Sequence, residues 1–292
     1  MKSQGTLLVC VPNYRGILLQ EAHLSFTRLM YWLGHERFPV TEQYEKSASC
    51  ERARQVCVDT ALGSPDIEHV LFIDDDMVFT IDDFAALWRE YEDNNLDFLS
   101  ALAFRNSMPT CPCIFGKIPN HPRWGEKEWW CILSDYPGLP RQRWNKDLAQ
   151  YEMFHPNGPH RRFKVEATGF GMVLIRKRAL EQMRRDKDGN VIPGFRHFSC
   201  PKAHSPHEDV AFCLNAIDKG LDIWCDSRVR IRHLTKEQPT IGEDTYIAQG
   251  DAVEFPPVPI PARLRLQEDT TTETVTLEPL EARAAIGNGV PV

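Results

Sequence analysis

The sequence predicts an α/β protein with a mostly parallel central sheet that helices flank. Short apolar runs rich in β-branched residues alternate with segments that repeat apolar residues at helical spacing. One of the runs, VLFI (70–73), is apolar at every position, as expected for a strand that is covered on both faces. These two observations favour a Rossmann-like arrangement, with the first hundred residues resembling one nucleotide-binding unit.

The N-terminal part contributes a strand and two helices. TLLVCVP (6–12) is a short apolar run that a proline stops, which is typical of a strand ending in a loop. Apolar residues then recur at helical spacing over 24–35 and again over 50–63. Gly34 and Gly63 lie near the ends of these two segments, where glycine commonly terminates a helix.

The middle of the chain begins regularly and then loses its pattern. After VLFI, Thr80 and Asp83 have the spacing of a capping box and open an amphipathic helix. A strand is expected over 96–104. Residues 105–164 are rich in proline, glycine and tryptophan, so we expect an irregular insertion, and long loops inside a compact domain are commonly functional.

Regular patterns return after the insertion. GMVLIRKRALEQM (171–183) predicts a strand that runs into a helix, and HEDVAFCLNAIDKG (207–220) predicts a helix that ends at its glycine. Two short strands are expected after it, over 221–226 and 228–233.

The 292 residues can form one large α/β domain or two small ones, and the composition is that of a globular protein. We expect the domain over 1–235, and a Pro-rich arm with a weakly ordered tail over 236–292. The formal net charge of -7 gives no overall electrostatic footprint for nucleic acid. No leader is visible and no apolar run approaches the ~20 residues of a membrane-spanning helix, so we expect a soluble cytoplasmic protein without a membrane segment.

The cysteines do not suggest a disulfide framework or a zinc site. There are nine of them, an odd number, and they are scattered through predicted strands and helices. This pattern favours reduced thiols. Cys111 and Cys113 are close in sequence but lack the second pair that a zinc site would need.

Three consecutive carboxylates, Asp74 to Asp76, follow the buried run VLFI directly. Residues i and i+2 of a strand share a face, so Asp74 and Asp76 are expected to grip one cation together while Asp75 points away. Ligands of open α/β sheets bind at the carboxyl ends of the strands, and Mg²⁺ or Mn²⁺ favours carboxylates together with substrate phosphates. The pattern therefore indicates a metal-bound diphosphate; an acidic loop that caps the next helix is the alternative.

In three places the chain resembles the nucleotide-sugar glycosyltransferases of the GT-A fold, particularly the family 2-like group. The first is the apolar strand ending in D-x-D, preceded by ERARQ (51–55), in which Gln55 stands where that group often has Asn. The second is ATGFGMVLIRKRALE (167–181), which is similar to the Gly-rich segment of the group. The third is HEDVAFCLNAIDKGLDIWCDSRVRIRHL (207–234), which is similar to its Glu-Asp helix and trailing histidine. The third match is the most specific feature of the chain, and the order of the three adds to it. The resemblance covers roughly residues 5–235 apart from the insertion.

The resemblance implies a nucleoside diphosphate sugar as donor, with UDP-sugar favoured, and a Mn²⁺ or Mg²⁺ ion. Asp76 and Asp74 would hold the ion across the two phosphates, where it neutralises the charge of the leaving diphosphate. His233 is either a further ligand or an ordinary strand histidine. Arg54 either binds nucleotide phosphate or ribose, or lies on the surface of its helix. The remaining donor-side residues that the resemblance implies are Pro12, Asn13 and Tyr14 after the first strand, Asp75 at the ribose, and Gly169, Phe170 and Gly171 beside the sugar.

By the same resemblance, the activity is that of an inverting hexosyl- or pentosyltransferase. An inverting transfer needs a carboxylate that removes the proton from the acceptor hydroxyl. Asp209 is the candidate base and Glu208 the reserve. Both lie in the first turn of a predicted helix, whose dipole favours the ionised form. The alternative is that the two carboxylates only cap that helix.

Two other functions stay open. A nucleotidyltransferase would also use a Rossmann-like sheet and metal-binding carboxylates, but it normally begins with a Gly-rich, basic phosphate loop, which CVPNYRG (10–16) is not. A catalytically silent sugar-nucleotide-binding module would be expected to lose the Glu-Asp pair or D-x-D. Both motifs are intact in this sequence.

The sequence does not decide among DNA, a glycan, a protein and a small molecule as the acceptor. Basic residues interleaved with aromatic ones are the footprint of a nucleic-acid groove, so one hypothesis is a hydroxymethylated base in DNA. A charge run on a solvated loop is the alternative, and the tryptophans either form a stacking wall or pack the loop onto its domain. The residues concerned are Arg141, Arg143, Lys146, Arg161, Arg162 and Lys164, with Trp124, Trp129, Trp130, Trp144, Phe154 and Phe163.

Overall fold

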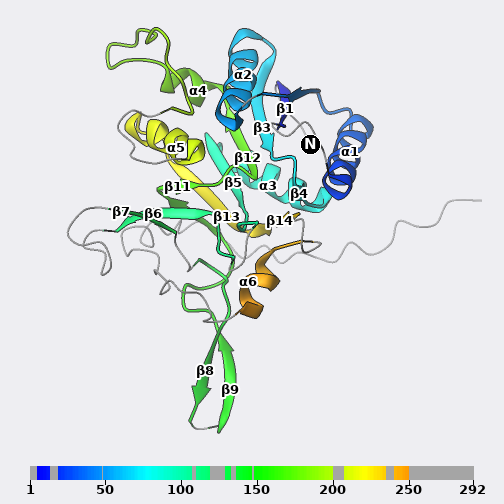
Figure 1. The fold of residues 1–292 in the computed structure, drawn as a ribbon, viewed down its shortest axis with the longest axis vertical. Helices are drawn as coiled ribbons and strands as arrows, with labels where there is room; N and C mark the ends of the chain where they lie inside the picture. Colours follow the sequence, from blue (N-terminus) through cyan, green and yellow to red (C-terminus); the bar gives the residue numbers. More distant parts are fainter. Residues whose placement is uncertain are drawn as a thin grey trace, which may run out of the picture.

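A seven-stranded sheet forms the centre of the protein, in the strand order β10-β13-β5-β12-β3-β1-β2 (Figure 1). The structure is a computed structural model. The strands of this sheet are β1 (Thr6–Pro12), β2 (Val40–Glu45), β3 (Ile67–Ile73), β5 (Phe98–Leu102), β10 (Arg162–Val165), β12 (Met172–Arg176) and β13 (Ile223–Arg230). The structure describes residues 5–13, 19–47, 49–106, 110–118, 129–132, 136–146, 148–199, 207–234 and 240–249.

Most strands of the sheet run in the same direction. β2, β1, β3, β5 and β13 are parallel to one another in direction, whereas β12, which lies between β3 and β5, and the edge strand β10 run against them. The expected α/β fold with a mostly parallel central sheet is therefore confirmed. The two strands expected over 221–233 form the long β13 and a separate two-residue strand, β14 (Arg232–His233).

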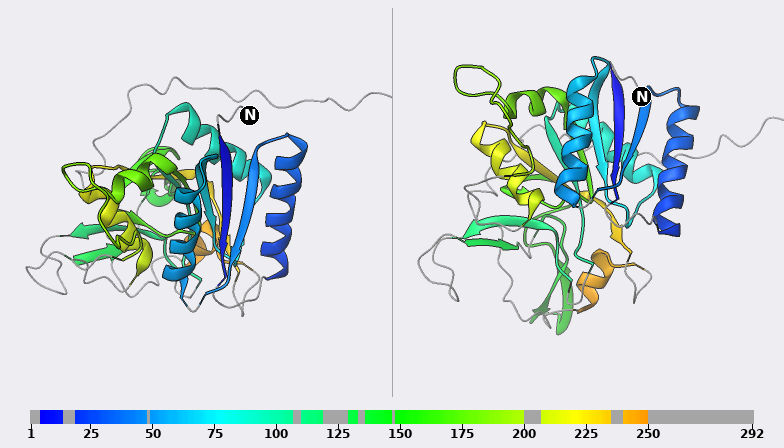
Figure 2. Two further views of the ribbon diagram at one scale, coloured as in Figure 1. Left: turned by 90° about the horizontal axis from the view of Figure 1, so that it is seen from above. Right: turned by 45° about the horizontal axis from the view of Figure 1, so that its top comes forward.

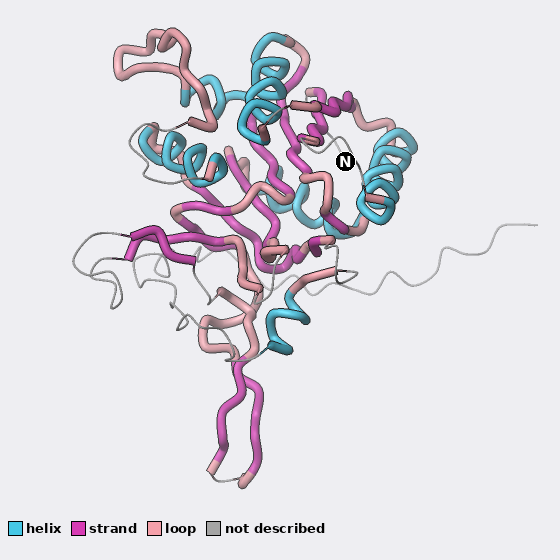
Figure 3. The backbone as a smooth tube through the Cα atoms, in the orientation of Figure 1, coloured by secondary structure: helices cyan, strands magenta, loops and turns pink. Residues whose placement is uncertain are grey.

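Helices flank the sheet, as Figures 2 and 3 show from different sides. One buried cluster joins α1 and α3 to the sheet, and a second cluster joins α2, α4 and α5 to it. The helices of these clusters are α1 (Gln20–His35), α2 (Cys50–Gly63), α3 (Ile81–Asp93), α4 (Lys177–Met183) and α5 (Glu208–Asp218).

β3 shows why its sequence is apolar at consecutive positions. Val70 and Phe72 belong to the cluster with α2, α4 and α5, whereas Leu71 and Ile73 belong to the cluster with α1 and α3. Successive side chains of a strand point to opposite faces, so a strand covered on both faces needs an apolar residue at each position. Full burial of such a side chain contributes about 1.5 to 3 kcal/mol. The strand is thereby fixed in register up to the point where the carboxylates begin.

Helix caps stabilise the starts of α2, which precedes β3 in the chain, and α3, which follows it. The Ser49 hydroxyl accepts a hydrogen bond of 3.3 Å from the Arg52 N–H at the start of α2. At the start of α3, the Asp83 N–H donates to the Thr80 hydroxyl at 3.1 Å and the Thr80 N–H donates to the Asp83 carboxylate at 2.8 Å. The capping box that the sequence predicted is therefore confirmed.

Residues 105–164 contain several short strands where the sequence led us to expect an irregular insertion. β6 (Ile114–Ile118) pairs with β7 (Trp129–Ile132) and with β11 (Ala167–Thr168) in a small three-stranded sheet. β8 (Arg141–Asn145) and β9 (Gln150–Phe154) form a two-stranded ribbon that projects from the body of the protein (Figure 1). These strands have two to five residues each, which is too short for a clear alternation of apolar and polar residues.

The predicted arm after residue 235 includes one short helix, α6 (Glu243–Gln249), on which Tyr246 is buried. Residues 250–292, for which a tail is predicted, lie outside the described residues. Within the described ranges, no helix combines the length and the apolar character needed to cross a bilayer.

We predict that His69 makes folding pH-dependent. His69 is 3% exposed in β3, and its Nδ1 lies 3.3 Å from the Tyr91 hydroxyl. Burial, together with the charges of Arg176 and Arg178, lowers the pKa of His69 to about 4. The unfolded chain takes up this proton near pH 6.5, so stability present above that pH is lost as the pH falls toward 4. The loss attributable to His69 is expected to reach at most about 3 kcal/mol.

Urea unfolding at a series of pH values checks this expectation. The free energy of unfolding of His69→Gln should fall less steeply between pH 6.5 and 4 than that of the wild type. His35→Gln is the control, because the side chain of His35 is 73% exposed. Parallel curves for all three proteins would contradict the prediction.

Candidate functional site

The three carboxylates lie in a tight turn after β3. The Asp74 N–H donates to the Gly171 carbonyl at 3.1 Å, and the Met77 N–H donates to the Asp74 carbonyl at 3.2 Å. Because the chain turns here, the two-residue alternation of a strand does not apply to Asp74 and Asp76. Strand alternation therefore does not place these two side chains on one face, and the structure gives each a different partner among the described contacts. Their joint binding of one cation stays a prediction.

Asp74 is paired with a buried arginine. Arg54 on α2 is 3% exposed, and its Nη2 lies 2.7 Å from Asp74 Oδ1. Its Nη1 lies 2.7 Å from Oε1 of Glu208, the first residue of α5. The guanidinium also lies over the Phe170 ring, 5.0 Å from its centroid. Arg54 thus joins α2, the end of β3 and the start of α5, and is not on the surface of its helix.

Arg54, Asp74 and Glu208 form a charged triad, in which each carboxylate stabilises the positive charge of the arginine. Burial lowers the pKa of Arg54, but the carboxylates of Asp74 and Glu208 outweigh that effect and raise it, so the guanidinium stays charged. Burial raises the pKa of Asp74, and Arg54 opposes that shift. A buried ion pair of this kind is tolerated when both partners are hydrogen-bonded, as they are here.

Asp76 faces His233. Its Oδ1 lies 3.2 Å from His233 Nε2. The backbone holds the two residues together, because β4 (Met77–Val78) pairs with β14 and the Leu234 N–H donates to the Asp76 carbonyl at 2.8 Å. The other ring nitrogen, Nδ1, contacts the Phe104 carbonyl oxygen. Burial lowers the pKa of His233, but the hydrogen bond and charge of Asp76 outweigh it and raise the pKa.

The Asp76 and His233 pair fits two neighbouring ligands of a divalent cation. With metal-ligand distances of 2.0 to 2.2 Å, adjacent ligands of an octahedral ion lie about 3 Å apart. A metal-binding histidine usually donates its other N–H to a carbonyl or carboxylate, which is the role open to the Phe104 carbonyl. Among the residues that the structure describes, no three His, Cys, Asp or Glu side chains gather as a metal group. Mg²⁺ sites often take further ligands from substrate phosphates.

Glu208 and Asp209 begin α5, but they differ in their partners. Glu208 accepts from Arg54, whereas Asp209 Oδ1 accepts from the Val210 N–H at 2.8 Å. We expected the helix dipole to favour the ionised form of both. For Asp209 the opposite effect dominates, because burial raises its pKa even though Arg54 opposes the shift.

Gly169 lies beside Asp209 and leaves no room for a side chain. A Cβ at this position would come within 2.9 Å of Cys113 Cβ and 3.8 Å of Asp209 Oδ2. At Gly171 a Cβ would come within 3.0 Å of Met77 Cε. The bare backbone of this segment therefore borders both the carboxylate turn and Asp209. Phe170 between them is 1% exposed and packs in the core, so its ring does not line a surface for a sugar.

The other predicted donor-side residues lie near the turn or outside the described part. Pro12 is the buried last residue of β1, and the Asn13 N–H donates to the Glu45 carbonyl at 2.9 Å. Asp75 is 6% exposed. Tyr14 lies outside the described residues.

Three residues near the carboxylates carried no functional signal in the sequence. The Cys50 thiol, at the start of α2, is close enough to Glu208 for a hydrogen bond, and the combined effect of burial and its neighbours raises its pKa. Burial raises the pKa of Cys113, and Asp209 adds to that shift. The Phe104 carbonyl contacts His233 Nδ1, and a contact made by a backbone atom cannot be recognised from the residue pattern.

Three of the six basic residues named in the insertion form ion pairs with acids among the described contacts. Arg162 lies 2.9 Å from Glu90, Lys164 lies 2.7 Å from Asp222, and Arg143 lies 2.6 Å from Glu152. Phe163 is buried in the core, and Arg143 lies over the Phe154 ring at 5.1 Å from its centroid. The side chains of Trp129, Trp130 and Trp144, and all of Trp124, lie outside the described part. These three ion pairs reduce the positive charge that the insertion presents.

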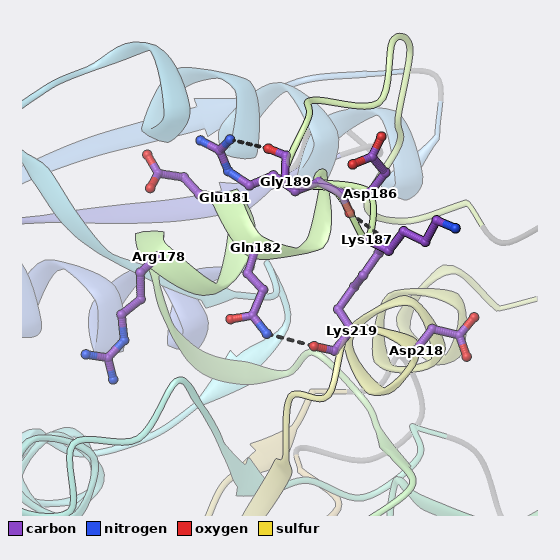
Figure 4. Close-up of a pocket in the computed structure, with 9 residues that line it drawn as sticks. Arg178, Glu181, Gln182, Asp186, Lys187, Gly189, Asp218 and Lys219 are labelled. Atoms are coloured by element: carbon purple, nitrogen blue, oxygen red, sulfur yellow. Dashed lines mark hydrogen bonds between the residues drawn. The ribbon is translucent and has the colours of Figure 1, made fainter.

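A separate shallow pocket lies between α4 and the C-terminal end of α5 (Figure 4). Side chains of both charges line it, among them Arg178, Glu181, Asp186 and Lys219. It lies at the opposite end of α5 from Glu208, so the candidate site residues do not take part in it.

The chain is distantly similar in structure to a number of solved proteins, among them the two that follow. No protein-family model matches the chain, and no curated protein matches its sequence. The crystal structure of A197 from STIV is similar with a TM-score of 0.46 and 14% identity, over 83% of this chain and 92% of that one. The crystal structure of GalNAc-T7 with UDP, GalNAc and Mn²⁺ is similar with a TM-score of 0.44 and 10% identity, over 80% of this chain and 45% of that one. At these values, neither similarity assigns a family or an activity.

We predict that Arg54 is needed for stability. In Arg54→Met, Asp74 and Glu208 remain partly buried without their cation, so the free energy of unfolding should fall by about 2 to 4 kcal/mol. Arg54→Lys should recover only part of this loss, because the single ammonium of lysine replaces a guanidinium whose two terminal nitrogens bind two carboxylates. Urea unfolding measures both.

Arg52→Met provides the matched control. Arg52 is exposed on the same helix, and its replacement should change the free energy of unfolding by no more than about 0.5 kcal/mol. Equal losses in the two methionine variants would show that the triad adds nothing to stability.

Proposed function

We propose that this protein is a metal-dependent, inverting glycosyltransferase of the GT-A type, which moves a sugar from a nucleoside diphosphate sugar to an acceptor hydroxyl. UDP-sugar is the favoured donor. The observation that carries the proposal is the 3.2 Å pairing of Asp76 with His233 in the turn that follows β3. Arg54 links that turn to the Glu208 and Asp209 pair at the start of α5. The pair proposed to bind the cation and the candidate base therefore both lie next to the buried junction that Arg54 forms with Asp74 and Glu208.

Asp76 and His233 are the residues that would hold Mn²⁺ or Mg²⁺, with diphosphate oxygens as further ligands. A cation bound there would neutralise the charge that develops on the leaving diphosphate. Asp74 was predicted as a second carboxylate ligand, but its Oδ1 is bound to Arg54. We therefore assign Asp74 the role of fixing the turn, and Asp76 with His233 the role of binding the ion.

Asp209 is the better candidate for the base. Glu208 Oε1 is already bound to Arg54, whereas among the described residues Asp209 accepts from the Val210 N–H and lies beside Gly169. A raised pKa suits this role, because a general base works best when its pKa approaches the operating pH. Asp209 would take the proton of the acceptor hydroxyl, and Glu208 would keep the start of α5 in place.

The donor and the acceptor would approach from different segments. Pro12, Asn13 and Tyr14 follow β1 and are proposed to contact the nucleotide with Asp75, and the Gly169 to Gly171 backbone to border the sugar. Cys113, whose Cβ lies close to Gly169, belongs to the 105–164 region, so we propose that this region forms the acceptor side. The pairing of its basic residues does not favour DNA over a glycan, a protein or a small molecule.

We predict metal-dependent nucleotide binding. Calorimetric titration of UDP and GDP, each with and without MnCl₂, should show binding of one nucleotide that requires Mn²⁺. In Asp76→Ala and in His233→Ala the affinity should fall about 10- to 100-fold or more, because a ligand of the ion is lost. Asp82→Ala, an exposed carboxylate on α3, should bind like the wild type. Binding that ignores Mn²⁺ and both site variants would refute the proposed metal pair.

We predict separate roles for the two carboxylates of α5. Release of UDP from UDP-sugars, measured with a panel of glycans, peptides and hydroxymethylated DNA as acceptors, should fall about 10²- to 10⁴-fold in Asp209→Asn. Donor binding should be kept. Glu208→Gln keeps an oxygen that can accept from Arg54, so its loss should be smaller. A larger loss in Glu208→Gln than in Asp209→Asn would reverse the assignment.

The same assays distinguish the rival functions. Metal-dependent donor binding without turnover on any acceptor, unchanged by Asp209→Asn, indicates a silent sugar-nucleotide-binding module. Release of pyrophosphate from a nucleoside triphosphate and a sugar phosphate indicates a nucleotidyltransferase.

A further inference from the structure

Helix α6 is fastened at both ends to residues far away in sequence. At its start, the Tyr136 hydroxyl donates to Glu243 Oε1 at 2.8 Å. At its end, Gln249 accepts from the Thr110 N–H at 2.9 Å and donates to the Thr110 carbonyl at 2.5 Å. For a helix of only seven residues, these contacts supply much of what holds it in place.

The middle of α6 closes an aromatic cluster. The Tyr246 ring centroid lies 5.7 Å from that of Phe104 and 6.4 Å from that of Tyr136, and the last two rings lie 6.1 Å apart. Phe104 and Tyr136 are fully buried, and Tyr246 is 8% exposed. Edge and tilted ring contacts at these separations fix orientation as well as position. The position of Phe104 therefore depends on the docking of α6.

Phe104 and α6 both connect to His233. The Phe104 carbonyl oxygen contacts His233 Nδ1, and the opposite ring nitrogen faces Asp76. The backbone of His233 pairs with Ile241 through two hydrogen bonds of 2.8 and 2.7 Å, just before α6 begins. The position of His233 is thus set from two sides, by the backbone that leads into α6 and by the carbonyl that α6 helps to hold.

We propose that α6 is a clasp that positions His233 for a divalent cation, with Tyr136 and Glu243 as positioning residues. This inference rests on the proposed metal pair. When Nδ1 donates to the Phe104 carbonyl, the Nε2 lone pair is left to face the ion, and the ring angle is fixed. Loss of such an outer contact typically weakens metal binding about 10- to 100-fold.

The environment of Glu243 makes the clasp sensitive to small changes. Besides Tyr136, Arg230 Nη1 contacts Glu243 Oε2, and His160 Nε2 lies 3.9 Å from Oε1. The side chain of Glu243 is 11% exposed. Its neighbour Asp244 is 66% exposed and forms an ion pair of 2.9 Å with Arg232. Replacing the carboxylate by an amide at each of the two positions removes the same charge from α6. A difference between the two variants therefore reports on the clasp.

The test compares Tyr136→Phe and Glu243→Gln with Asp244→Asn. Mn²⁺ alone, titrated into the full chain and followed by its electron paramagnetic resonance signal, should bind about 10-fold more weakly to the first two variants. Asp244→Asn should bind like the wild type. Nitrogen-15 spectra of the His233 ring at high pH, assigned with His233→Gln, are recorded in an Asp76→Ala background, because the Asp76 carboxylate at Nε2 would otherwise compete for the ring proton. In this background the Nδ1-protonated form should dominate. Tyr136→Phe and Glu243→Gln should show a mixture of both tautomers.

Unchanged Mn²⁺ affinity and an unchanged His233 tautomer in Tyr136→Phe and Glu243→Gln would overturn the clasp, even if both variants melt at a lower temperature. Tyr136→Phe keeps the ring in the cluster, so it tests the proposal if Glu243→Gln does not fold. A wild type that binds no Mn²⁺ would refute the metal pair instead. In that case the tautomer still decides whether α6 orients His233.

Discussion

Arg54 donates from inside the protein to Asp74 at the end of β3 and to Glu208 at the start of α5. Removing a guanidinium from water is costly unless its charge and hydrogen bonds are matched, and here each terminal nitrogen meets a carboxylate. The three charges therefore determine how α2, β3 and α5 meet. Asp76 follows Asp74 by two residues and Asp209 follows Glu208 directly, so the position of both depends on this junction.

The junction also explains how like charges lie side by side without preventing folding. Asp74 is matched by Arg54 and Asp76 by His233, while the turn separates the two pairs. At α5 the same arginine matches Glu208 and leaves Asp209, whose pKa burial raises. In the proposed function, one carboxylate of each pair, Asp74 or Glu208, holds the structure, and the other, Asp76 or Asp209, takes part in the chemistry. In this account α6 adds the last constraint, by fixing the orientation of His233.

The sequence predicted the parts that local patterns encode. β1 and α2 have the predicted bounds, 6–12 and 50–63, because a proline or glycine marks each end. The edge strand β2 was missed, since its polar sequence VTEQYE lacks a clear apolar alternation. The contact of Arg54 with Glu208 spans 154 residues, and that of Phe104 with His233 uses a backbone carbonyl. The spacing of residues along the sequence does not reveal side-chain contacts between distant segments or contacts made by backbone carbonyls. The candidate residues could therefore be named from the sequence, but their partners could not.

Anomalous diffraction from crystals grown with UDP and MnCl₂ tests the central claim most directly. Data collected at the manganese absorption edge locate the ion without reference to any activity. The account predicts an anomalous peak within bonding distance, about 2.2 Å, of both Asp76 Oδ1 and His233 Nε2. It also predicts that Arg54 keeps its contacts with Asp74 and Glu208. A peak bound by Asp74 with Arg54 displaced, or UDP bound with no manganese beside Asp76, would contradict it.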